Sequence, residues 1–409
     1  MIKMAKFRQS FPRPLVADIP ATVHRELALV MQGRDLKPGA EIAITAGSRG
    51  INNLVPIYRA AVDCLKGMGF RPFLFAAMGS HGGGTVEGQR KILLELGVNE
   101  DSVGAPIRVT CDTVELGTIS EGRKVRCDKI AAAADAILVI NRVKPHTAFR
   151  SEIESGLWKM MAVGMGKVPG ATMVHRLGPG EIGSVIKEMG QVFLAKLPVL
   201  GGLAIVENGY DETAIIKGLR ASEMAEEAKL LTLAKTYLPR LPVDHLDVLI
   251  VDEMGKNFSG TGMDVNVIGR WRLPGVEEPE RPKIKYIVVL DLSKKSEGNA
   301  NGIGLADLTT RKLVDKIDFP ATYLNLFTTK FFSRGMIPIT LETDQEAIEL
   351  ALKSLALDDL KKARVMRISN TMHLEYVYAS EALFNELELK GLVRIEETFL
   401  QFDDLGNLV

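Results

Sequence analysis

The sequence contains very little cysteine. Only 3 of its 409 residues are cysteines, and Cys64, Cys111 and Cys127 lie far apart. An odd number of widely spaced cysteines argues against a disulfide framework and against a cysteine-based zinc or iron–sulfur site. We therefore expect all three thiols to be reduced.

An excess of charge of either sign is also missing. The chain has 51 basic and 51 acidic residues, with the 46% hydrophobic and 25% charged content of an ordinary globular protein. Balanced charge creates no overall field that would attract nucleic acid or a membrane surface. We expect no nucleic-acid partner and no membrane association.

Long apolar runs and repeats are absent as well. No stretch reaches the ~18 uninterrupted apolar residues of a membrane span. Residues 1–7 lack the apolar core of a secretory signal, so the expected location is the cytoplasm. No repeat of solenoid length and no low-complexity tract stands out, which excludes the usual repeat folds.

What the chain does contain is a series of strand–turn–helix units. Residues 40–46 predict a strand that ends in a tight turn at Gly47–Gly50, and a helix follows from Leu54 to Leu65. The unit recurs, with a strand at 72–77 and a helix at 86–96. Further strands are predicted at 107–111, 136–140 and 200–206, and further helices at 183–195 and 221–237. This alternation indicates an α/β protein with mostly parallel sheets.

The length predicts more than one domain, because a single core rarely serves 409 residues. Two prolines within residues 238–243 indicate a linker. We predict an N-terminal cofactor-binding α/β domain over residues 1–240, possibly joined by 388–409, and a C-terminal α/β domain over 241–387, with an active-site cleft between them. Elements of the second domain are expected at 246–252, 285–290, 305–316, 337–341, 345–355, 365–368 and 380–386.

Residues 141–176 are the stretch around which the chemistry is expected. They follow the buried strand 136–140 and present His146, Lys159 and His175 in a loop of glycines and short apolar segments, while His81 lies in a similar loop at 78–84. Imidazole transfers protons near neutral pH and is a common metal ligand. The alternative for each histidine is a purely structural role in a surface loop.

Three further features suggest binding. Backbone N–H groups of Gly79, Gly82 and Gly83 could cradle an anion, although neither a P-loop lysine nor a dinucleotide fingerprint is present. Arg49, beside Ser48, suits bidentate recognition of carboxylate or phosphate. The alternatives are a flexible turn and a solvated arginine. Loops that follow parallel strands converge at one edge of the sheet, where ligands bind.

Lys159 is flanked by Trp158 and Met160. Desolvation by such neighbours would lower the pKa of the lysine and make it a better nucleophile. A lysine that extends from an apolar helix to solvent is the ordinary alternative. No His-Glu-x-x-His motif is present, so an all-protein zinc site has little support.

Taken together, these residues resemble the nickel-dependent lactate racemase family. The resemblance consists of the Gly-x-His loop ending at His81, Pro145-His146 after a later strand, Lys159, and His175 sixteen positions further on (175 − 159 = 16). Residues 255–264, GKNFSGTGMD, resemble the branch of this family that acts on 2-hydroxy acids other than lactate.

The resemblance implies a racemase or epimerase that inverts C2 of a 2-hydroxy acid by reversible hydride transfer. The cofactor would be a nickel-pincer nucleotide, a pyridinium mononucleotide that holds Ni(II) through carbon and two sulfurs, supplied by cofactor-synthesis proteins. The implied roles are attachment of the cofactor to Lys159, Ni(II) ligation by His175, acid/base chemistry by His81 and His146, substrate carboxylate binding by Arg49 and Lys256, and further cofactor contacts from Ser48, Gly79, Gly82 and Gly83. Four donors in a plane suit Ni(II).

The sequence departs from the lactate enzymes at several positions. Ala46 and Gly50 stand where the family usually has an acidic residue and a proline, and the lysine is preceded by Ser155-Gly156-Leu157-Trp158. We therefore expect a substrate other than lactate. The alternatives are a nicotinamide-dependent 2-hydroxy acid dehydrogenase and a non-catalytic nucleotide- or anion-binding protein. The sequence does not fix the oligomeric state.

Overall fold

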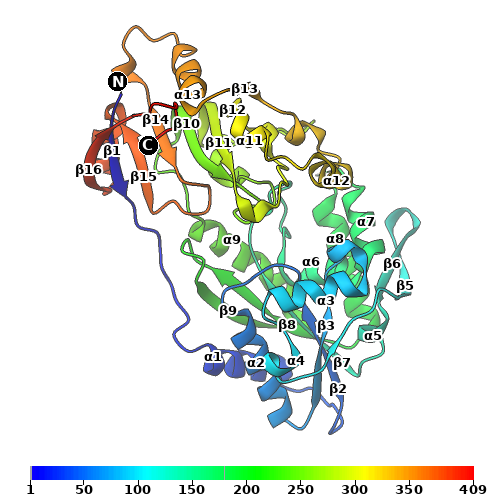
Figure 1. The fold of residues 1–409 in the computed structure, drawn as a ribbon. Helices are drawn as coiled ribbons and strands as arrows, with labels where there is room; N and C mark the ends of the chain where they lie inside the picture. Colours follow the sequence, from blue (N-terminus) through cyan, green and yellow to red (C-terminus); the bar gives the residue numbers. More distant parts are fainter. Residues whose placement is uncertain (1, 179) are drawn as a thin grey trace. The chain divides into compact units, whose positions relative to one another are not determined.

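The computed structural model describes residues 2–178 and 180–409. The chain forms two compact units, one of Pro12–Leu238 and one that combines Met1–Phe11 with Pro239–Val409. Each unit contains its own β-sheet of mixed parallel and antiparallel strands, together with helices (Figure 1). Among the described residues, no helix is long and apolar enough to cross a membrane.

The unit Pro12–Leu238 is built on a six-stranded sheet of order β4-β3-β2-β7-β8-β9, which is parallel except for β9. Its strands are β2 (Glu41–Ala46), β3 (Arg71–Ala76), β4 (Ile107–Arg108), β7 (Ala136–Arg142), β8 (Val199–Glu207) and β9 (Thr213–Arg220). A separate hairpin is formed by β5 (Thr113–Ile119) and β6 (Arg123–Asp128).

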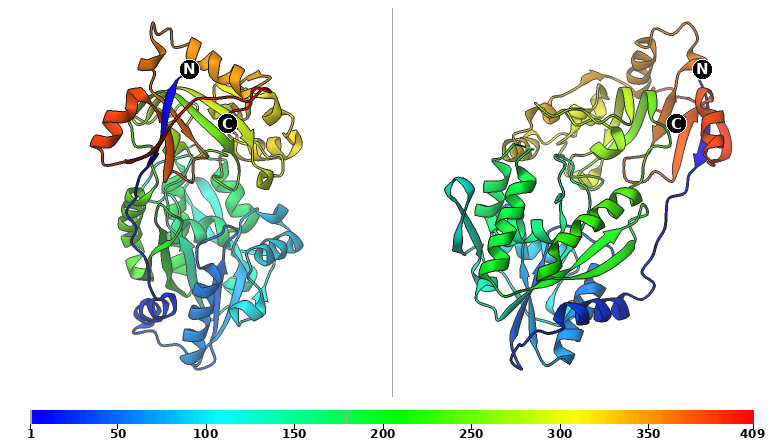
Figure 2. Two further views of the ribbon diagram at one scale, coloured as in Figure 1. Left: turned by 60° about the vertical axis from the view of Figure 1, so that its left-hand side comes forward. Right: turned by 180° about the vertical axis from the view of Figure 1, so that it is seen from behind.

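Helices cover both faces of this sheet, as the two further views show (Figure 2). They are α1 (Ile19–Met31), α2 (Leu54–Gly67), α3 (Val86–Glu95), α4 (Glu100–Val103), α5 (Lys129–Ala132), α6 (Gly156–Lys159), α7 (Lys167–His175), α8 (Ile182–Lys196) and α9 (Glu227–Tyr237). Side chains alternate across each strand, so Ile42 and Ile44 belong to the core with α1 and α2, whereas Ala43 belongs to the core with α6–α9. Burial on both faces explains why these strands are nearly uninterrupted apolar runs.

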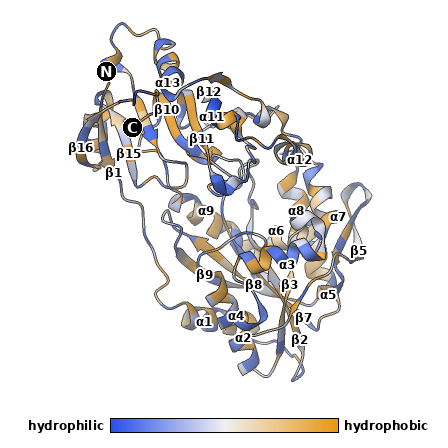
Figure 3. Cartoon of the chain, in the orientation of Figure 1, coloured by the Kyte–Doolittle hydropathy of each residue, from blue (hydrophilic) through white to orange (hydrophobic). Residues whose placement is uncertain are grey.

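The other unit has an eight-stranded sheet of order β13-β12-β11-β10-β14-β15-β1-β16. The five strands from β13 to β14 are parallel, and the remaining pairings are antiparallel. The strands are β1 (Lys3–Arg8), β10 (His245–Met254), β11 (Lys283–Leu292), β12 (Leu308–Thr310), β13 (Ile339–Leu341), β14 (Val365–Ile368), β15 (Tyr376–Ser380) and β16 (Val393–Phe399). Its helices are α10 (Val265–Ile268), α11 (Arg311–Val314), α12 (Phe319–Thr329), α13 (Asp344–Lys353) and α14 (Phe384–Leu389). The central strands β10 and β11 are predominantly hydrophobic (Figure 3).

The predicted fold class, α/β with mostly parallel sheets, is confirmed, and the strands predicted at 40–46, 72–77, 136–140 and 200–206 are β2, β3, β7 and β8. The segment 107–111 forms a strand only at Ile107–Arg108.

The assignment of the chain ends was wrong. The first domain was predicted to include residues 1–11, with 388–409 as a possible addition, but β1 pairs with both β15 and β16 in the eight-stranded sheet of the other unit. The reason is the sheet edge: β15 would otherwise expose unpaired backbone groups, and the two chain ends extend the sheet beyond it.

The expectation of a loop throughout 141–176 was also wrong. From Gly156 the chain is helical, passing from α6 through a π-helical segment, η3 (Met160–Met165), into α7. Tertiary packing overrides the low helix propensity of its glycines. At Gly164, for example, a Cβ atom would lie 2.7 Å from the carbonyl oxygen of Ala77, so only glycine allows the helix to approach the end of β3.

Candidate functional site

The predicted site residues of the unit Pro12–Leu238 follow the carboxyl ends of neighbouring parallel strands. Strands β3, β2 and β7 are adjacent and parallel, so their ends lie along one edge of the sheet. Ser48 and Arg49 follow β2, His81 follows β3, and His146 follows β7. This edge is where open α/β sheets bind ligands.

His81 is held in one tautomer by its loop. Its Nδ1 atom lies 2.9 Å from the carbonyl oxygen of Met78 and 2.8 Å from Oγ of Ser48. A carbonyl oxygen can only accept, so Nδ1 carries the hydrogen and Nε2 presents its lone pair. Desolvation by the surrounding protein lowers the pKa of His81 to about 4, and the positive charges of Arg49, Lys159 and His175 act in the same direction. At neutral pH His81 is therefore a neutral base.

The glycine loop around His81 is folded back on its own backbone. The N–H of Gly79 donates to the carbonyl of Gly164 at 3.2 Å, and the N–H of Gly84 donates to that of His81 at 3.2 Å. Thr85 then caps α3 by accepting from the N–H of Gly88. The N–H of Gly79 is thus engaged within the protein, which leaves Gly82 and Gly83 as the predicted anion contacts in this loop.

His146 is held in the opposite tautomer. The backbone N–H of Ala148 donates to its Nδ1 atom at 3.1 Å, so Nδ1 is unprotonated and Nε2 carries the hydrogen. Its own backbone N–H donates to the carboxylate of Glu154 at 2.8 Å, and its ring packs on Phe149 with centroids 4.4 Å apart. His81 and His146 therefore present a lone pair and an N–H group, respectively, at the same kind of ring position.

Lys159 lies where α6 passes into the π-helical segment. Desolvation by the surrounding protein lowers its pKa to about 8, with further contributions from the charges of Arg49 and Lys144. A lysine with this pKa is substantially unprotonated at slightly alkaline pH and can act as a nucleophile. Single π-helical turns are rare in proteins as a whole, and those that do occur are often found at functional sites.

His175 is the last residue of α7 and is partly buried. Desolvation lowers its pKa to about 4, and the charge of Lys159 adds to this shift. A neutral imidazole is the form that binds metal ions. Across the described residues no group of three or more His, Cys, Asp and Glu side chains is arranged to hold a metal, so a metal bound to His175 would need further donors from a bound group.

The edge of the sheet is strongly cationic. Desolvation and the charge of Arg142 lower the pKa of Arg49, although part of the Arg49 side chain is exposed. Arg49 and Lys144 both act on Lys159. Arg142 forms an ion pair with Glu207. An anionic ligand would relieve the mutual repulsion of the positive charges of Arg49, Lys144 and Lys159.

Lys256 belongs to the other unit and follows β10. Its ammonium group donates to the carbonyl of Gly260 at 2.7 Å and to Oδ1 of Asn325 on α12 at 3.0 Å. Its backbone N–H donates to Oγ of Ser296 at 2.7 Å. The lysine is thus fixed within a polar loop of its own unit.

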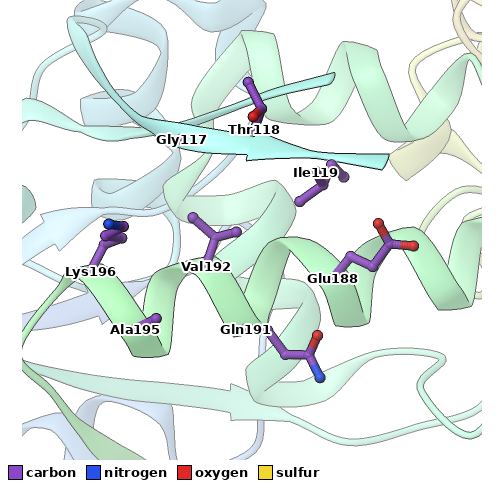
Figure 4. A pocket seen from close by; sticks show the side chains of 8 residues that line it. All are labelled: Gly117, Thr118, Ile119, Glu188, Gln191, Val192, Ala195 and Lys196. Atoms are coloured by element: carbon purple, nitrogen blue, oxygen red, sulfur yellow. The ribbon is translucent and has the colours of Figure 1, made fainter. Parts of the chain in front are cut away.

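A pocket of about 420 Å³ lies elsewhere, between the β5–β6 hairpin and α8 (Figure 4). It is lined by residues 117–119 of β5 and by Glu188, Val192 and Lys196 among the residues of α8. None of the predicted site residues lines it. Its walls offer no histidine and no arginine.

Several residues that position the site were missed in the sequence. Glu154 and Glu227 are buried carboxylates that hold the backbone near His146 and Lys159, and no local pattern distinguishes them from surface acids. Lys144, which precedes Pro145-His146 and whose charge acts on Lys159, was missed as well. Its position in a short basic run after a buried strand was a usable signal.

The fold and the site define a two-unit α/β protein with a basic, histidine-bearing edge on one of its parallel sheets. No protein-family model matches the sequence, and no curated protein matches it. Among solved structures, the chain is similar to the lactate racemase apoprotein from Thermoanaerobacterium thermosaccharolyticum. The identity is 12%, the match covers 89% of this chain and 94% of that chain, and the TM-score is 0.50. At this identity the likeness concerns the fold.

Proposed function

We propose that the protein is a racemase or epimerase that inverts C2 of a 2-hydroxy acid with a nickel-pincer nucleotide. The observation that carries this proposal is the pair of histidines in opposite tautomers, His81 and His146, on the same unit as a lysine of lowered pKa and a third histidine, His175, whose pKa is also lowered. The similarity in fold to a lactate racemase apoprotein supports it.

In the proposed reaction the histidines handle the hydroxyl proton. The lone pair on Nε2 of His81 accepts the proton of the 2-hydroxyl group, while the N–H group on Nε2 of His146 donates a hydrogen bond to substrate oxygen. The imidazolium form of His81 can return this proton to the substrate oxygen when the keto acid is reduced, so the proton balance closes within the site. For His146 to act as the base toward the opposite enantiomer, it must adopt its other tautomer, with the hydrogen on Nδ1 and the lone pair on Nε2. The lowered pKa of His81 keeps it unprotonated at neutral pH and ready to accept.

The chain's residues fit the proposed cofactor. The pKa of about 8 makes Lys159 a suitable attachment point, and neutral His175 is a suitable nickel ligand. The positive charge of Lys144 suits a nucleotide phosphate. When bound, the cofactor supplies a reversible acceptor for the C2 hydrogen as hydride, which the side chains of the protein cannot supply.

Substrate binding is assigned to basic side chains. Arg49 can bind a carboxylate through two parallel N–H groups. Lys256 is proposed as a second substrate ligand on the strength of the resemblance, and the hydrogen bonds of its ammonium group to Gly260 and Asn325 fix its orientation. Replacement of either residue by alanine is expected to raise KM more than it lowers kcat.

Cofactor attachment is tested by mass spectrometry. The protein is produced together with the nickel-pincer synthesis proteins and nickel, and peptides that contain Lys159 are searched for an adduct. The Lys159→Ala variant is the control for attachment elsewhere. Unmodified Lys159 in a protein that also contains no nickel would refute the cofactor assignment.

Turnover is tested with a panel of chiral 2-hydroxy acids in deuterated water, read by chiral chromatography and by deuterium content at C2. Hydride return predicts inversion with little deuterium at C2. Rapid exchange at C2 would instead indicate proton abstraction. Net production of reduced nicotinamide would favour the dehydrogenase, and tight anion binding without turnover would favour the non-catalytic alternative.

A further inference from the structure

Helix α9 contacts both segments that carry the proposed cofactor lysine and the proposed histidine acid. The helix is anchored in the core of its unit by Leu230, Leu231 and Ala234, all of which are buried. Its first residue, Glu227, reaches the start of α6, and Lys235 near its end reaches Glu154. Neither contact is predictable from local sequence.

The first contact fixes the helix that ends in Lys159. Glu227 is only 3% exposed, burial raises its pKa to about 8, and its carboxyl group accepts the backbone N–H of Leu157 at 2.5 Å. Ser155, the residue at the N-terminal end of α6, makes no side-chain cap, so Glu227 takes its place. A Cβ atom at Gly156 would lie 2.5 Å from this carboxylate, so the contact requires glycine there.

The second contact fixes the backbone of His146. The ammonium group of Lys235 lies 2.7 Å from Oε1 of Glu154, whose side chain is 0% exposed. The other oxygen of Glu154 accepts the backbone N–H of His146 at 2.8 Å. Because the N–H of Ala148, two residues further on, holds Nδ1 of the His146 ring, the backbone position determines the ring position.

The two anchor points are eight residues apart on one helix (235 − 227 = 8), which corresponds to about 12 Å along its axis. A rigid helix therefore sets the separation of the two segments. Displacement of a catalytic group by ~1 Å can cost about a hundredfold in rate.

We propose that α9 is a positioning element in which Glu227 sets the place of Lys159 and the Lys235–Glu154 pair sets the place of His146. This inference rests on the proposed function for its catalytic meaning, but the geometry it predicts can be measured in the unloaded protein. The opposing interpretation is that both side chains merely satisfy buried polar groups and contribute stability alone.

The test compares Glu227→Gln, Glu227→Ala and Lys235→Met with two matched controls, Glu226→Gln and Lys229→Met. Glu226 and Lys229 form an ion pair at 2.5 Å beside the same helix, but their side chains are 50% and 76% exposed. All variants are first compared by thermal unfolding, so that loss of the fold is recognised.

Two measurements on the unloaded protein report position. Labelling with acetic anhydride as a function of pH, read on the Lys159 peptide by mass spectrometry, gives the midpoint of its titration. Nitrogen-15 NMR of labelled histidine gives the tautomer of His146. Desolvation lowers the pKa of Lys159 to about 8, so Glu227→Ala, which releases the start of α6 and admits water to Lys159, is expected to move its midpoint upward. Glu227→Gln keeps an acceptor oxygen and is expected to lie between Glu227→Ala and the wild type. Lys235→Met is expected to reduce the fraction of His146 protonated at Nε2 and leave the Lys159 midpoint unchanged.

In the loaded enzyme, Glu227→Ala and Lys235→Met are each expected to lower kcat by ~10- to 100-fold, with a smaller effect on KM. If Glu227→Ala leaves the Lys159 midpoint unchanged and Lys235→Met leaves the His146 tautomer unchanged, the positioning proposal is wrong, whatever happens to activity. Should Glu227→Ala fail to fold, Glu227→Gln and Lys235→Met decide by the same criteria. If the variants show the expected shifts but the loaded wild-type protein has no racemase activity, the proposed function is wrong and the positioning role is supported.

Discussion

Lys167 and Asp128 form a buried ion pair that supports the His81 loop. Both side chains are 1% exposed, and their charged atoms lie 3.5 Å apart. The ammonium group also donates to the carbonyl of Ala76 at 2.8 Å and to Oε1 of Gln89 at 2.7 Å. Gln89 in turn donates to the carbonyl oxygens of Gly79 and His81, at 3.3 and 3.5 Å. The pair therefore connects the core to the proposed base.

Desolvation outweighs attraction at both members of this pair. Burial raises the pKa of Asp128 and lowers that of Lys167, although each charge partly opposes the shift of the other. Removing one partner leaves an uncompensated buried charge, which costs about 3–5 kcal/mol. Lys167→Met and Asp128→Asn should each lower the free energy of unfolding by roughly this amount. The double variant should cost much less than their sum, because no buried charge remains.

Urea unfolding followed by tryptophan fluorescence measures these changes. The chain has 2 tryptophans, so in a Trp271→Phe background the signal comes from buried Trp158, in the same unit as the pair. The destabilisation of Lys167→Met should also be smaller at pH 5 than at pH 8. With the lysine gone, the pKa of Asp128 rises further above its unfolded value, and the stability contributed by its protonated form is lost as the pH increases. Strict additivity of the single variants would refute this account of the pair.

Three further predictions concern individual residues. Because the pKa of His81 is lowered to about 4, kcat/KM should fall as the pH decreases through about 4 rather than through 6.5, and a limb of the pH–rate profile near 6.5 would contradict this assignment. Arg49→Gln removes a positive charge and should raise the Lys159 midpoint in pH-dependent acetylation above about 8, whereas an unchanged midpoint would exclude their coupling. Gly156→Ala should lower the unfolding free energy by about 1–3 kcal/mol more than Gly33→Ala does. Both glycines have positive φ, but of the two only Gly156 faces an atom within 4 Å. Equal losses of stability in urea unfolding would contradict this prediction.

The central strands and their turns could be predicted from local patterns. Residues 136–140 are a continuous apolar run because β7 is buried on both faces, and burial of this kind is visible in the composition. The same patterns located Arg49, His81 and His146 after strand ends. The helix that carries Lys159 was missed because its glycines lower helix propensity. Close packing of Gly156 on Glu227 and of Gly164 on Ala77 explains why glycine stands at these two positions.

The sequence by itself determined that Arg49, His81 and His146 follow strands of an α/β fold, because hydrophobic periodicity and residue type act over a few neighbours. The tertiary structure decided the strand order, the place of both chain ends and the tautomers of His81 and His146. It also decided that Glu227 holds a backbone 70 residues away and that Lys235 holds a carboxylate 81 residues away. Contacts of this range depend on how the whole core packs, so no local pattern encodes them.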